Sequence, residues 1–259
     1  MVRKNLMDIV TLSGVRKELL FYLDEGPRSL SEIREHLDTT SPEVSPRIKE
    51  LIEHNMVRFE DKKYHLTPMG RSIINNFKPF YNTINVYDQY WEWWEEHDLS
   101  SIPDELINKI GEIKNFVIIE DDPSDMSRTK TEFSNIISHS HKVIGVSCVF
   151  DESFPDLFVK ILKSQVPVSI VITDEVYNLF KNNYPNQLKE FLNDSNGAIY
   201  VSNIPIRVSH IVTEDCLFFS LCYKNGKFDI NSNIVSNDPS SMHWGIALFE
   251  YYRERAVKK

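Results

Sequence analysis

The chain has 259 residues, of which 41% are hydrophobic and 26% are charged, and its formal net charge is −9. These values are typical of an ordinary soluble protein with one domain or two. No apolar run approaches the roughly 20 residues that a membrane span needs, and the first residues, MVRKNLMDIV, lack the long apolar core of a secretory signal. We therefore predict a cytoplasmic protein with no membrane partner.

The charge is divided unevenly along the chain. Residues 1–80 hold 13 Lys and Arg against 12 Asp and Glu, a balance of +1, whereas residues 81–259 hold 16 against 26, a balance of −10. Because an acidic body repels phosphate, any contact with DNA is expected from the N-terminal part. The three cysteines, Cys148, Cys216 and Cys222, lack CxxC spacing, so neither a disulfide framework nor a zinc site is indicated.

The first 38 residues predict three short helices. Apolar spacing indicates helices over 6–12 and 15–23, and the second ends at Glu25-Gly26-Pro27. Ser29 and Glu32 match a capping box at the start of the third helix. A tight turn at Thr39-Thr40 leads into the next helix, so the segment has the helix-turn-helix pattern.

The fourth helix combines an apolar stripe with a polar outward face. The stripe contains Val44, Ile48, Leu51 and Ile52, and the opposite side carries Ser45, Arg47, Lys49 and Glu50. Two Ser-Pro pairs leave the start of this helix open, because each serine can be an N-cap followed by a first-turn proline. A start at Ser41 places Pro46 inside the helix and a start at Ser45 makes the helix short; we favour Ser41.

A short hairpin is predicted directly after this helix. Two apolar pairs, in residues 57–59 and 64–66, flank a polar tip at residues 60–63. A polar-faced helix followed by a basic hairpin is typical of a winged helix-turn-helix, although a three-helix bundle with a charged face would show part of this pattern. We therefore expect double-stranded DNA as a partner. The expected DNA-binding residues are Ser41, Ser45, Arg47, Lys49, Arg58, Lys62 and Lys63.

A long helix is predicted from Thr67-Pro68 to about His97, with a kink at Pro79. It carries a heptad-like apolar stripe: Ile73, Phe77, Phe80, Ile84, Tyr87, Trp91 and Trp94. This stripe has two interpretations that the sequence does not separate. It is either a homodimer seam, which would pair two recognition helices on a two-fold operator, or a surface that packs on the chain's own C-terminal domain.

Residues 116–259 have the pattern of an α/β domain. Apolar strands at 116–119, 143–146 and 166–172 alternate with helices, which predicts a largely parallel sheet. Strands at 198–201, 207–212 and 217–223 then follow one another, an Asn-Gly turn leads to a return strand at 228–230, and a helix over 239–256 ends the chain. The expected sheet is therefore parallel with an antiparallel edge.

Ligands of open α/β sheets bind beyond the carboxyl ends of the parallel strands. This rule predicts an effector site formed by Ser147, Cys148, Thr173, Asp174, Arg207 and His210. Each of these residues alone also fits a solvated loop residue or a satisfied polar group. GxSxG, GxxxxGK[ST], GxGxxG and HExxH are absent from the sequence, and the pair His139 and His141 lacks further ligands at metal spacing. We expect no enzyme activity, no metal and no cofactor.

Four segments together resemble one family: SPEVSPRIKEL, YHLTPMGRSI, HDLSSIPDELINKIGEI and HWGIALFEYYRERA. They resemble archaeal winged-helix regulators whose C-terminal sensor domain is named after a methanogenesis and filament-formation regulator. The resemblance implies a transcriptional regulator whose sensor is similar in outline to half of a phospholipase-D-type fold. The HxK motif of active phospholipases is absent, because Lys142 directly follows His141.

We therefore predict an α+β protein in three parts. Residues 1–78 form a winged helix-turn-helix domain, 79–115 a kinked connecting helix and linker, and 116–259 an α/β sensor domain. The predicted function is a homodimeric DNA-binding transcriptional regulator that senses a small molecule. One alternative is an enzyme or small-molecule-binding protein in which the N-terminal domain serves only dimerisation. Another is an adaptor that binds a second regulator through the aromatic helix.

Overall fold

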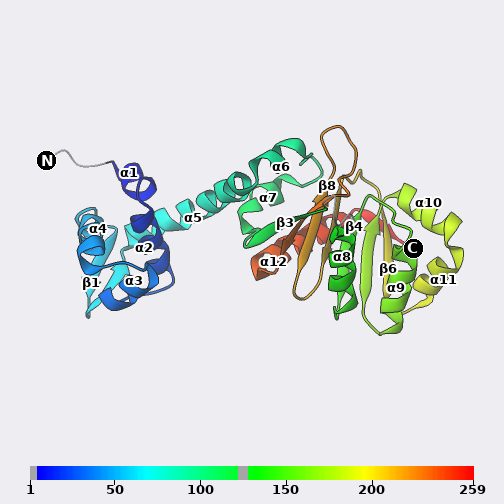
Figure 1. Cartoon of the computed structure of the whole chain (residues 1–259), viewed down its shortest axis with the longest axis horizontal. Coiled ribbons are helices and arrows are strands. Elements are labelled where there is room, and N and C mark those ends of the chain that lie inside the picture. Colours follow the sequence, from blue (N-terminus) through cyan, green and yellow to red (C-terminus); the bar gives the residue numbers. More distant parts are fainter. Residues whose placement is uncertain (1–4, 122–127) are drawn as a thin grey trace. The chain divides into compact units, whose positions relative to one another are not determined.

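The computed structural model describes residues 5–121 and 128–259 (Figure 1). The chain divides into two compact units, Met1–Tyr81 and Asn82–Lys259. Within the described residues, no helix has both the length and the apolar character needed to cross a membrane.

The N-terminal unit is a winged helix-turn-helix, as predicted. Its elements are α1 (Leu6–Thr11), α2 (Gly14–Asp24), α3 (Leu30–His36), α4 (Ser41–Glu53), β1 (Val57–Glu60), β2 (Lys63–Leu66) and the first part of α5 (Pro68–Gln89). The predicted capping box is confirmed at α3, where the Ser29 amide donates to the Glu32 carboxylate at 2.7 Å and the Glu32 amide donates to the Ser29 hydroxyl at 3.3 Å. The apolar faces of the helices meet in one buried core.

Helix α4 begins at Ser41, as favoured from the sequence, but its N-cap is Thr40. Thr40 and Glu43 form a second capping box, in which the Glu43 carboxylate accepts from the Thr40 amide at 3.1 Å. Pro46 lies inside the helix, and because proline has no N–H, one backbone hydrogen bond of the first turns is missing. Ile52, expected in the apolar stripe, is 39% exposed.

The hairpin of β1 and β2 is antiparallel, with Val57 opposite Leu66 and Glu60 opposite Lys63. Its two tip residues, Asp61 and Lys62, both have positive φ, at 51° and 62°, which is the backbone of a two-residue turn that matches strand twist. The predicted wing is therefore a regular hairpin.

The C-terminal unit has helices on both faces of an eight-stranded sheet. Its helices are the end of α5, α6 (Trp91–Glu96), α7 (Asp104–Ile107), the 3₁₀ turn η1 (Ile110–Glu112), α8 (Arg128–Ser138), α9 (Phe154–Lys163), α10 (Asp174–Asn183), α11 (Pro185–Asn193) and α12 (Pro239–Arg253). Its strands are β3 (Phe116–Glu120), β4 (Val143–Ser147), β5 (Val168–Ile172), β6 (Gly197–Ser202), β7 (Val208–Val212), β8 (Leu217–Leu221), β9 (Ser232–Ser236) and β10 (Ala256–Lys258).

The strand order is β10-β6-β5-β4-β7-β8-β9-β3. The α/β prediction is confirmed, but a largely parallel sheet was wrong. Within the described sheet the parallel pairs are β4–β5 and β5–β6, and β3 lies antiparallel to β9 at one edge. An alternation of strands and helices predicts how the chain crosses between strands, but it does not identify the neighbours of each strand.

Two smaller predictions at the end of the chain were also wrong. The return strand is β9, after residues 228–230, where Phe228 makes only an isolated bridge to Cys222. The last helix ends at Arg253, and the following residues form β10 on the edge of β6. In both places the backbone finds a partner strand that the local apolar pattern does not reveal.

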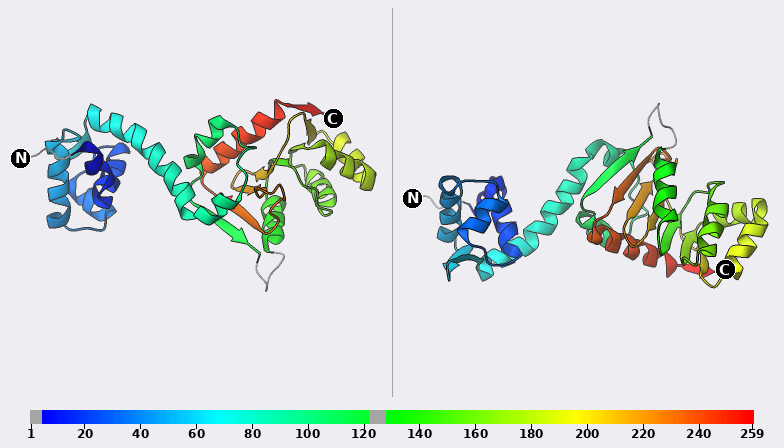
Figure 2. Two further views of the ribbon diagram at one scale, coloured as in Figure 1. Left: turned by 90° about the horizontal axis from the view of Figure 1, so that it is seen from above. Right: turned by 60° about the horizontal axis from the view of Figure 1, so that its bottom comes forward.

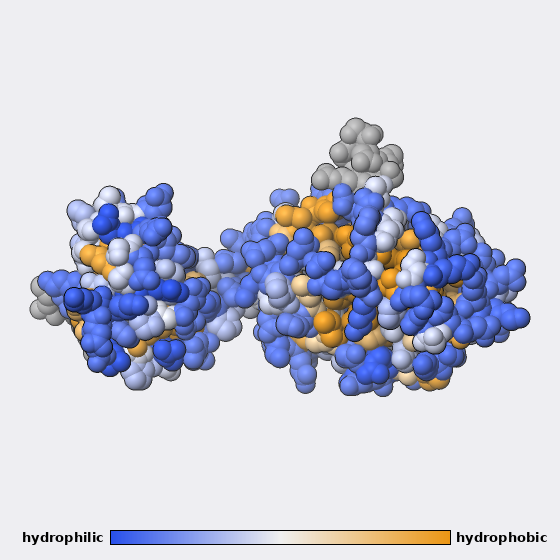
Figure 3. All heavy atoms as spheres, turned by 90° about the horizontal axis from the view of Figure 1, so that it is seen from below, coloured by the Kyte–Doolittle hydropathy of each residue, from blue (hydrophilic) through white to orange (hydrophobic). Residues whose placement is uncertain are grey.

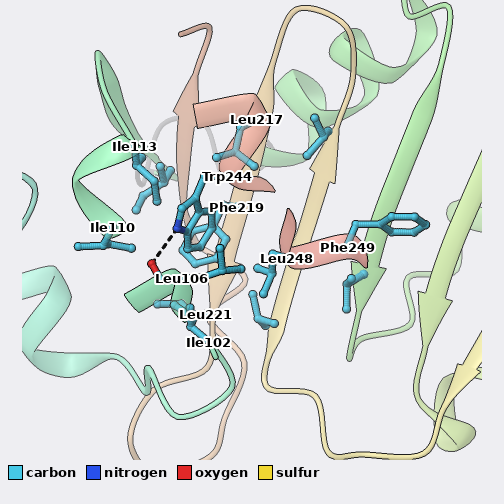
Figure 4. Packing of buried hydrophobic residues seen from close by; sticks show 14 of the residues in the cluster. Ile102, Leu106, Ile110, Ile113, Leu217, Phe219, Leu221, Trp244, Leu248 and Phe249 are labelled. Atoms are coloured by element: carbon cyan, nitrogen blue, oxygen red, sulfur yellow. Dashed lines mark hydrogen bonds between the residues drawn. The ribbon is translucent and has the colours of Figure 1, made fainter. Parts of the chain in front are cut away.

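The sheet separates two hydrophobic cores. Helix α12 covers one face, while α8 and α9 lie against the other (Figure 1, Figure 2). Alternate residues of each strand therefore point into different cores: Val212 packs on the α12 side and Ile211 on the α9 side. Trp244 of α12 is fully buried, and its indole N–H donates to the Leu106 carbonyl oxygen at 2.9 Å (Figure 4).

The predicted long helix is interrupted at Tyr90, whose φ of −141° and ψ of 53° separate α5 from α6. The apolar stripe along it is divided. Ile73 and Phe77 pack on the core of the N-terminal unit, and Tyr87 and Trp94 pack on the core of the C-terminal unit. The remaining members, Phe80, Ile84 and Trp91, are 61%, 46% and 62% exposed.

Candidate nucleic-acid interface and ligand site

The outward face of α4 is solvent-accessible at the positions predicted for DNA. Ser45, Arg47 and Lys49 are exposed, and Ser41 is partly exposed at the first helical position. The Lys49 ammonium lies 3.9 Å from the Glu53 carboxylate on the same helix. Arg47 makes no ion pair with any residue that the structure describes, so its guanidinium is free to reach a base edge or a phosphate.

Glu50, expected on this outward face, is turned inward instead. Its carboxylate pairs at 2.6 Å with the guanidinium of Arg16, a buried residue of α2. Arg16 also donates to the carbonyl oxygens of Ile9 at 2.6 Å and Asp8 at 3.2 Å. One side chain thus connects α1, α2 and α4. This role was not predictable from the sequence, because Arg16 lies in no motif and its partner is 34 residues away.

The wing presents the three predicted basic residues to solvent. Arg58 and Lys63 are exposed on the strands, and Lys62 is exposed at the tip. Arg58 is partly neutralised, since its guanidinium lies 3.0 Å from the Glu60 carboxylate. The aromatic ring of Phe59, 58% exposed, rests 4.8 Å from that of Tyr64. The wing therefore offers both cations and an apolar surface.

The six predicted effector residues lie in different surroundings. Ser147 is at the end of β4 and lines a cavity on the α9 side of the sheet. Thr173 caps α10 by accepting from the Val176 amide at 3.2 Å. The first residue of α10, Asp174, accepts from the Asn178 side chain at 2.9 Å, also on the helix surface.

Three other predicted effector residues point toward the opposite side. Arg207 pairs with Asp98 at 2.8 Å. Cys148 and Cys222 share a thiol hydrogen bond, and burial raises the pKa of both thiols. His210 is 1% exposed, and its Nε2 donates to the Gly245 carbonyl oxygen of α12 at 3.0 Å. Of the six residues, Ser147 and His210 line the same cavity, although the His210 side chain bonds to α12, and the other four have different neighbours.

The charge of His210 follows from its burial. Burial lowers its pKa to about 4, against a smaller opposing effect of the hydrogen bond to Gly245. Because Nε2 carries the donated proton, Nδ1 is unprotonated, and it has no hydrogen-bond partner among the described residues. His210 is therefore neutral at physiological pH.

A second buried histidine belongs to a network that the sequence did not predict. His97 Nε2 lies 3.2 Å from the Asp229 carboxylate, and His97 Nδ1 donates to the Trp93 carbonyl oxygen at 2.5 Å. Burial raises the pKa of Asp229, but hydrogen bonds from His97, Ser232 and the Asn231 amide outweigh it, so the pKa is lowered. A Ser, a His and an Asp meet here, but the His97 and Asp229 side chains are each 1% exposed, so a substrate does not reach them.

In the parts of the chain that the structure describes, no cluster of three or more His, Cys, Asp or Glu has the arrangement of a metal site. His139 and His141, the HxH pair, bind different partners. His141 Nδ1 lies 2.9 Å from the Glu214 carboxylate, and His139 Nδ1 donates to the Asn135 carbonyl oxygen at 2.8 Å.

A comparison with known families decides what the chain is related to. A family model for the middle domain of the methanogenesis regulatory protein FilR1 matches residues 126–255, half of the chain. The chain belongs to this family. A second model, the HVO_A0261 N-terminal domain, matches residues 5–89. The family predicted by resemblance is thereby confirmed.

Individual relatives are distant. The methanogenesis regulatory protein FilR1 of Methanothrix harundinacea (strain 6Ac) is 18% identical over 250 residues, which cover 94% of this chain and 56% of that protein. The chain thus spans about half the length of this curated relative. Among solved structures, the archaeal chromatin protein TrmBL2 has a TM-score of 0.45 at 10% identity, covering 97% of this chain and 96% of the other. The phospholipase D family member Nuc from Salmonella typhimurium has a TM-score of 0.42 at 13% identity, covering 56% and 97%.

Proposed function

We propose that the chain is a DNA-binding transcriptional regulator, with a winged-helix unit that contacts double-stranded DNA and an α/β unit that senses a small molecule. The exposed polar face of α4, with Arg47 and Lys49, and the adjoining basic wing are the observation that carries the proposal. A winged helix places this helix in the major groove and the hairpin on the backbone. Membership of the FilR1 family, named for a regulatory protein, supports the same function.

Each exposed side chain has a role in this proposal. Ser41, Ser45 and Arg47, at the N-terminal half of α4, face the bases, and Arg47 can donate two parallel hydrogen bonds to guanine. Lys49 holds phosphate beside them. Arg58, Lys62 and Lys63 place the wing on the phosphate backbone, which positions the helix without reading sequence.

Arg47→Ala tests the groove assignment. Binding of the full chain to DNA fragments from upstream of its own gene is measured by fluorescence anisotropy at physiological salt. Loss of a bidentate contact should weaken binding by about 1–3 kcal/mol and relax the preference at the contacted base pair. Arg71→Ala, which removes an exposed arginine of α5, is the matched control and should bind like the wild type.

Two results would count against the proposal. Unchanged affinity and base preference in Arg47→Ala would remove α4 from the groove. If the wild-type chain at micromolar concentration does not bind the DNA upstream of its own gene, the alternative function is favoured. That alternative is a small-molecule-binding protein or enzyme whose N-terminal unit serves dimerisation.

We also propose that the regulator acts as a homodimer. The residues Phe80, Ile84 and Trp91 support this part, because they are the exposed members of a stripe with the heptad-like spacing at which helices pair. A two-fold dimer would supply two recognition helices for two half-sites.

A further inference from the structure

A cleft of about 280 Å³ opens on the sheet face opposite α12. Strands β7, β8 and β9 form its floor, and α8 and the segment before α9 form one wall. A cavity of about 40 Å³ adjoins it and shares the lining residues Phe133, Phe154 and Ser209. Hydrophobic side chains reach the surface of the C-terminal unit between hydrophilic ones (Figure 3). One residue that lines the cleft, Ile230, is 70% exposed.

A polar row consists of Ser147, Ser209, Ser220 and Asn233; the last three lie on the floor of the cleft, and Ser147 lines the adjoining cavity. Strand register aligns these residues. Ser209 of β7 is opposite Ser220 of β8. Extending the β4–β7 and β8–β9 pairings by one residue places Ser147 opposite Ser209 and Ser220 opposite Asn233. Hydrogen bonds confirm the alignment, since the Ser209 hydroxyl donates to that of Ser147 at 3.4 Å and the Ser220 hydroxyl donates to the Asn233 side-chain oxygen. One line of neutral polar groups thus crosses four strands.

The polar row has hydrogen-bonding capacity left over. Ser220 and Asn233 are 3% and 5% exposed, yet the Asn233 amide nitrogen has no partner among the residues that the structure describes. The hydroxyl oxygens of Ser209 and Ser220 each donate once and can still accept. This nitrogen is not fully enclosed by protein atoms, so a ligand in the cleft can reach it. The floor therefore offers one donor beside two acceptors and no formal charge.

The walls of the cleft are aromatic. The ring of Phe133 stacks on that of Phe154, with centroids 5.1 Å apart, and meets the edge of Phe218 at 5.3 Å. The two charges nearest this wall cancel, because the Lys130 ammonium lies 3.1 Å from both carboxylate oxygens of Asp151. A flat ring gains stacking with these phenylalanines, whereas an anion entering the cleft would lose its hydration without a free cation among the described lining residues. Asp121, which also lines the cleft, would repel it.

We propose that this cleft binds an uncharged heteroaromatic ring that carries an amide or lactam edge. Such an edge has a carbonyl oxygen next to an N–H, which complement the free Asn233 N–H and the serine oxygens of the polar row. The ring behind the edge lies against Phe133 and Phe154. This inference rests on the proposed function only where it identifies the bound ring as the signal of the regulator.

The binding experiment uses the full chain and isothermal titration calorimetry. Uracil, hypoxanthine and nicotinamide are the probes, because each combines a flat ring with an amide or lactam edge. Benzoate and toluene are the matched controls, the first being charged and the second lacking the edge. We expect saturable one-to-one binding of at least one probe and no saturation with either control.

Asn233→Asp tests the role of the polar row. Aspartate has almost the same shape and still accepts from Ser220, but it lacks the free N–H donor. The best probe should bind at least tenfold more weakly. Ser209→Ala is a second, milder variant that removes one acceptor and should also weaken binding. Asn193→Asp makes the same chemical change at an exposed position of α11 outside the cleft and should bind like the wild type.

Three outcomes would overturn the inference: no saturable binding of any of the three probes, equal binding in Asn233→Asp and the wild type, or loss of binding in Thr173→Val at the strand ends instead. DNA affinity is measured on the same samples. Ring binding without DNA binding would reject the proposed function alone, and DNA binding without ring binding would reject this inference alone.

Discussion

His210 donates its single imidazole proton to the Gly245 carbonyl oxygen, 3.0 Å away between β7 and α12. A proton added to Nδ1 would create a buried cation without a partner, which is why burial lowers the pKa to about 4. In the unfolded chain the pKa returns to an ordinary value near 6.5. Between about pH 6.5 and pH 4 the unfolded state therefore binds one more proton than the folded state, and stability falls as the pH falls.

His210→Gln should remove this pH dependence, since glutamine keeps a donor for Gly245 but does not titrate. From pH 7 to pH 5 the free energy of unfolding of the wild type should fall by about 2 kcal/mol through this group, given about 1.4 kcal/mol per pH unit and proton. Urea unfolding followed by tryptophan fluorescence measures the loss, because all four tryptophans lie in the C-terminal unit. His139→Gln, at an exposed position, should keep the wild-type slope. Identical slopes in His210→Gln and the wild type would refute the assignment.

Residues of the proposed ligand site differ in how well they could be predicted from the sequence. Ser147 was predicted, because it ends an apolar strand. Ser209, Ser220 and Asn233 carry no local signal, and they meet Ser147 only through the register of β4, β7, β8 and β9. That register depends on long-range pairing, so residues up to 86 positions apart become neighbours only once the sheet is known.

At the scale of elements, local signals predicted local structure. The capping box of α3 was readable from a few adjacent residues, whereas two Ser-Pro pairs left the start of α4 open between Ser41 and Ser45. Asn55, with φ of 55°, is in the left-handed conformation just after the end of α4, which asparagine tolerates. The pairing of β3 with β9 was not predictable, since it joins segments more than 110 residues apart through tertiary packing. The wing was predicted because its two apolar strands are neighbours in the sequence, separated by a short polar tip.

The Arg16–Glu50 pair predicts how the N-terminal unit responds to mutation. Arg16→Met leaves the Glu50 carboxylate without its arginine and frees two carbonyl groups of α1, so the unit should lose about 3 kcal/mol of stability. Hydrogen exchange should show faster exchange in α1, α2 and α4. Arg16→Met combined with Glu50→Met should recover part of the loss, because the carboxylate that paired with Arg16 is then removed as well. Arg34→Met, at an exposed position of α3, is the control. Unchanged protection in Arg16→Met would show that the pair contributes little.

At the scale of the whole molecule, the charge division fits the proposed roles of the two units. The acidic balance of residues 81–259 keeps that unit away from phosphate, and the near-neutral balance of residues 1–80 leaves α4 and the wing to meet it. This division was visible in the sequence. The sequence did not separate a dimer seam from intramolecular packing, because all residues of the apolar stripe have the same heptad-like spacing. The structure divides the stripe by burial: Ile73, Phe77, Tyr87 and Trp94 pack within the chain, whereas Phe80, Ile84 and Trp91 are exposed.

Ile84→Glu tests the proposed dimer. Ile84 is 46% exposed, so glutamate should leave the fold intact, but a carboxylate placed in an apolar seam would lose its hydration and separate the subunits. Multi-angle light scattering should give the wild type twice the chain mass of 30.3 kDa and the variant a single chain mass. Leu179→Glu, at a position of α10 that is 44% exposed, is the matched control and should remain dimeric.

A dimer binds two half-sites at once, so Ile84→Glu should also bind a two-fold operator more weakly while keeping its affinity for one half-site. A wild-type monomer at micromolar concentration, or a dimeric Ile84→Glu, would show that this seam does not join two subunits.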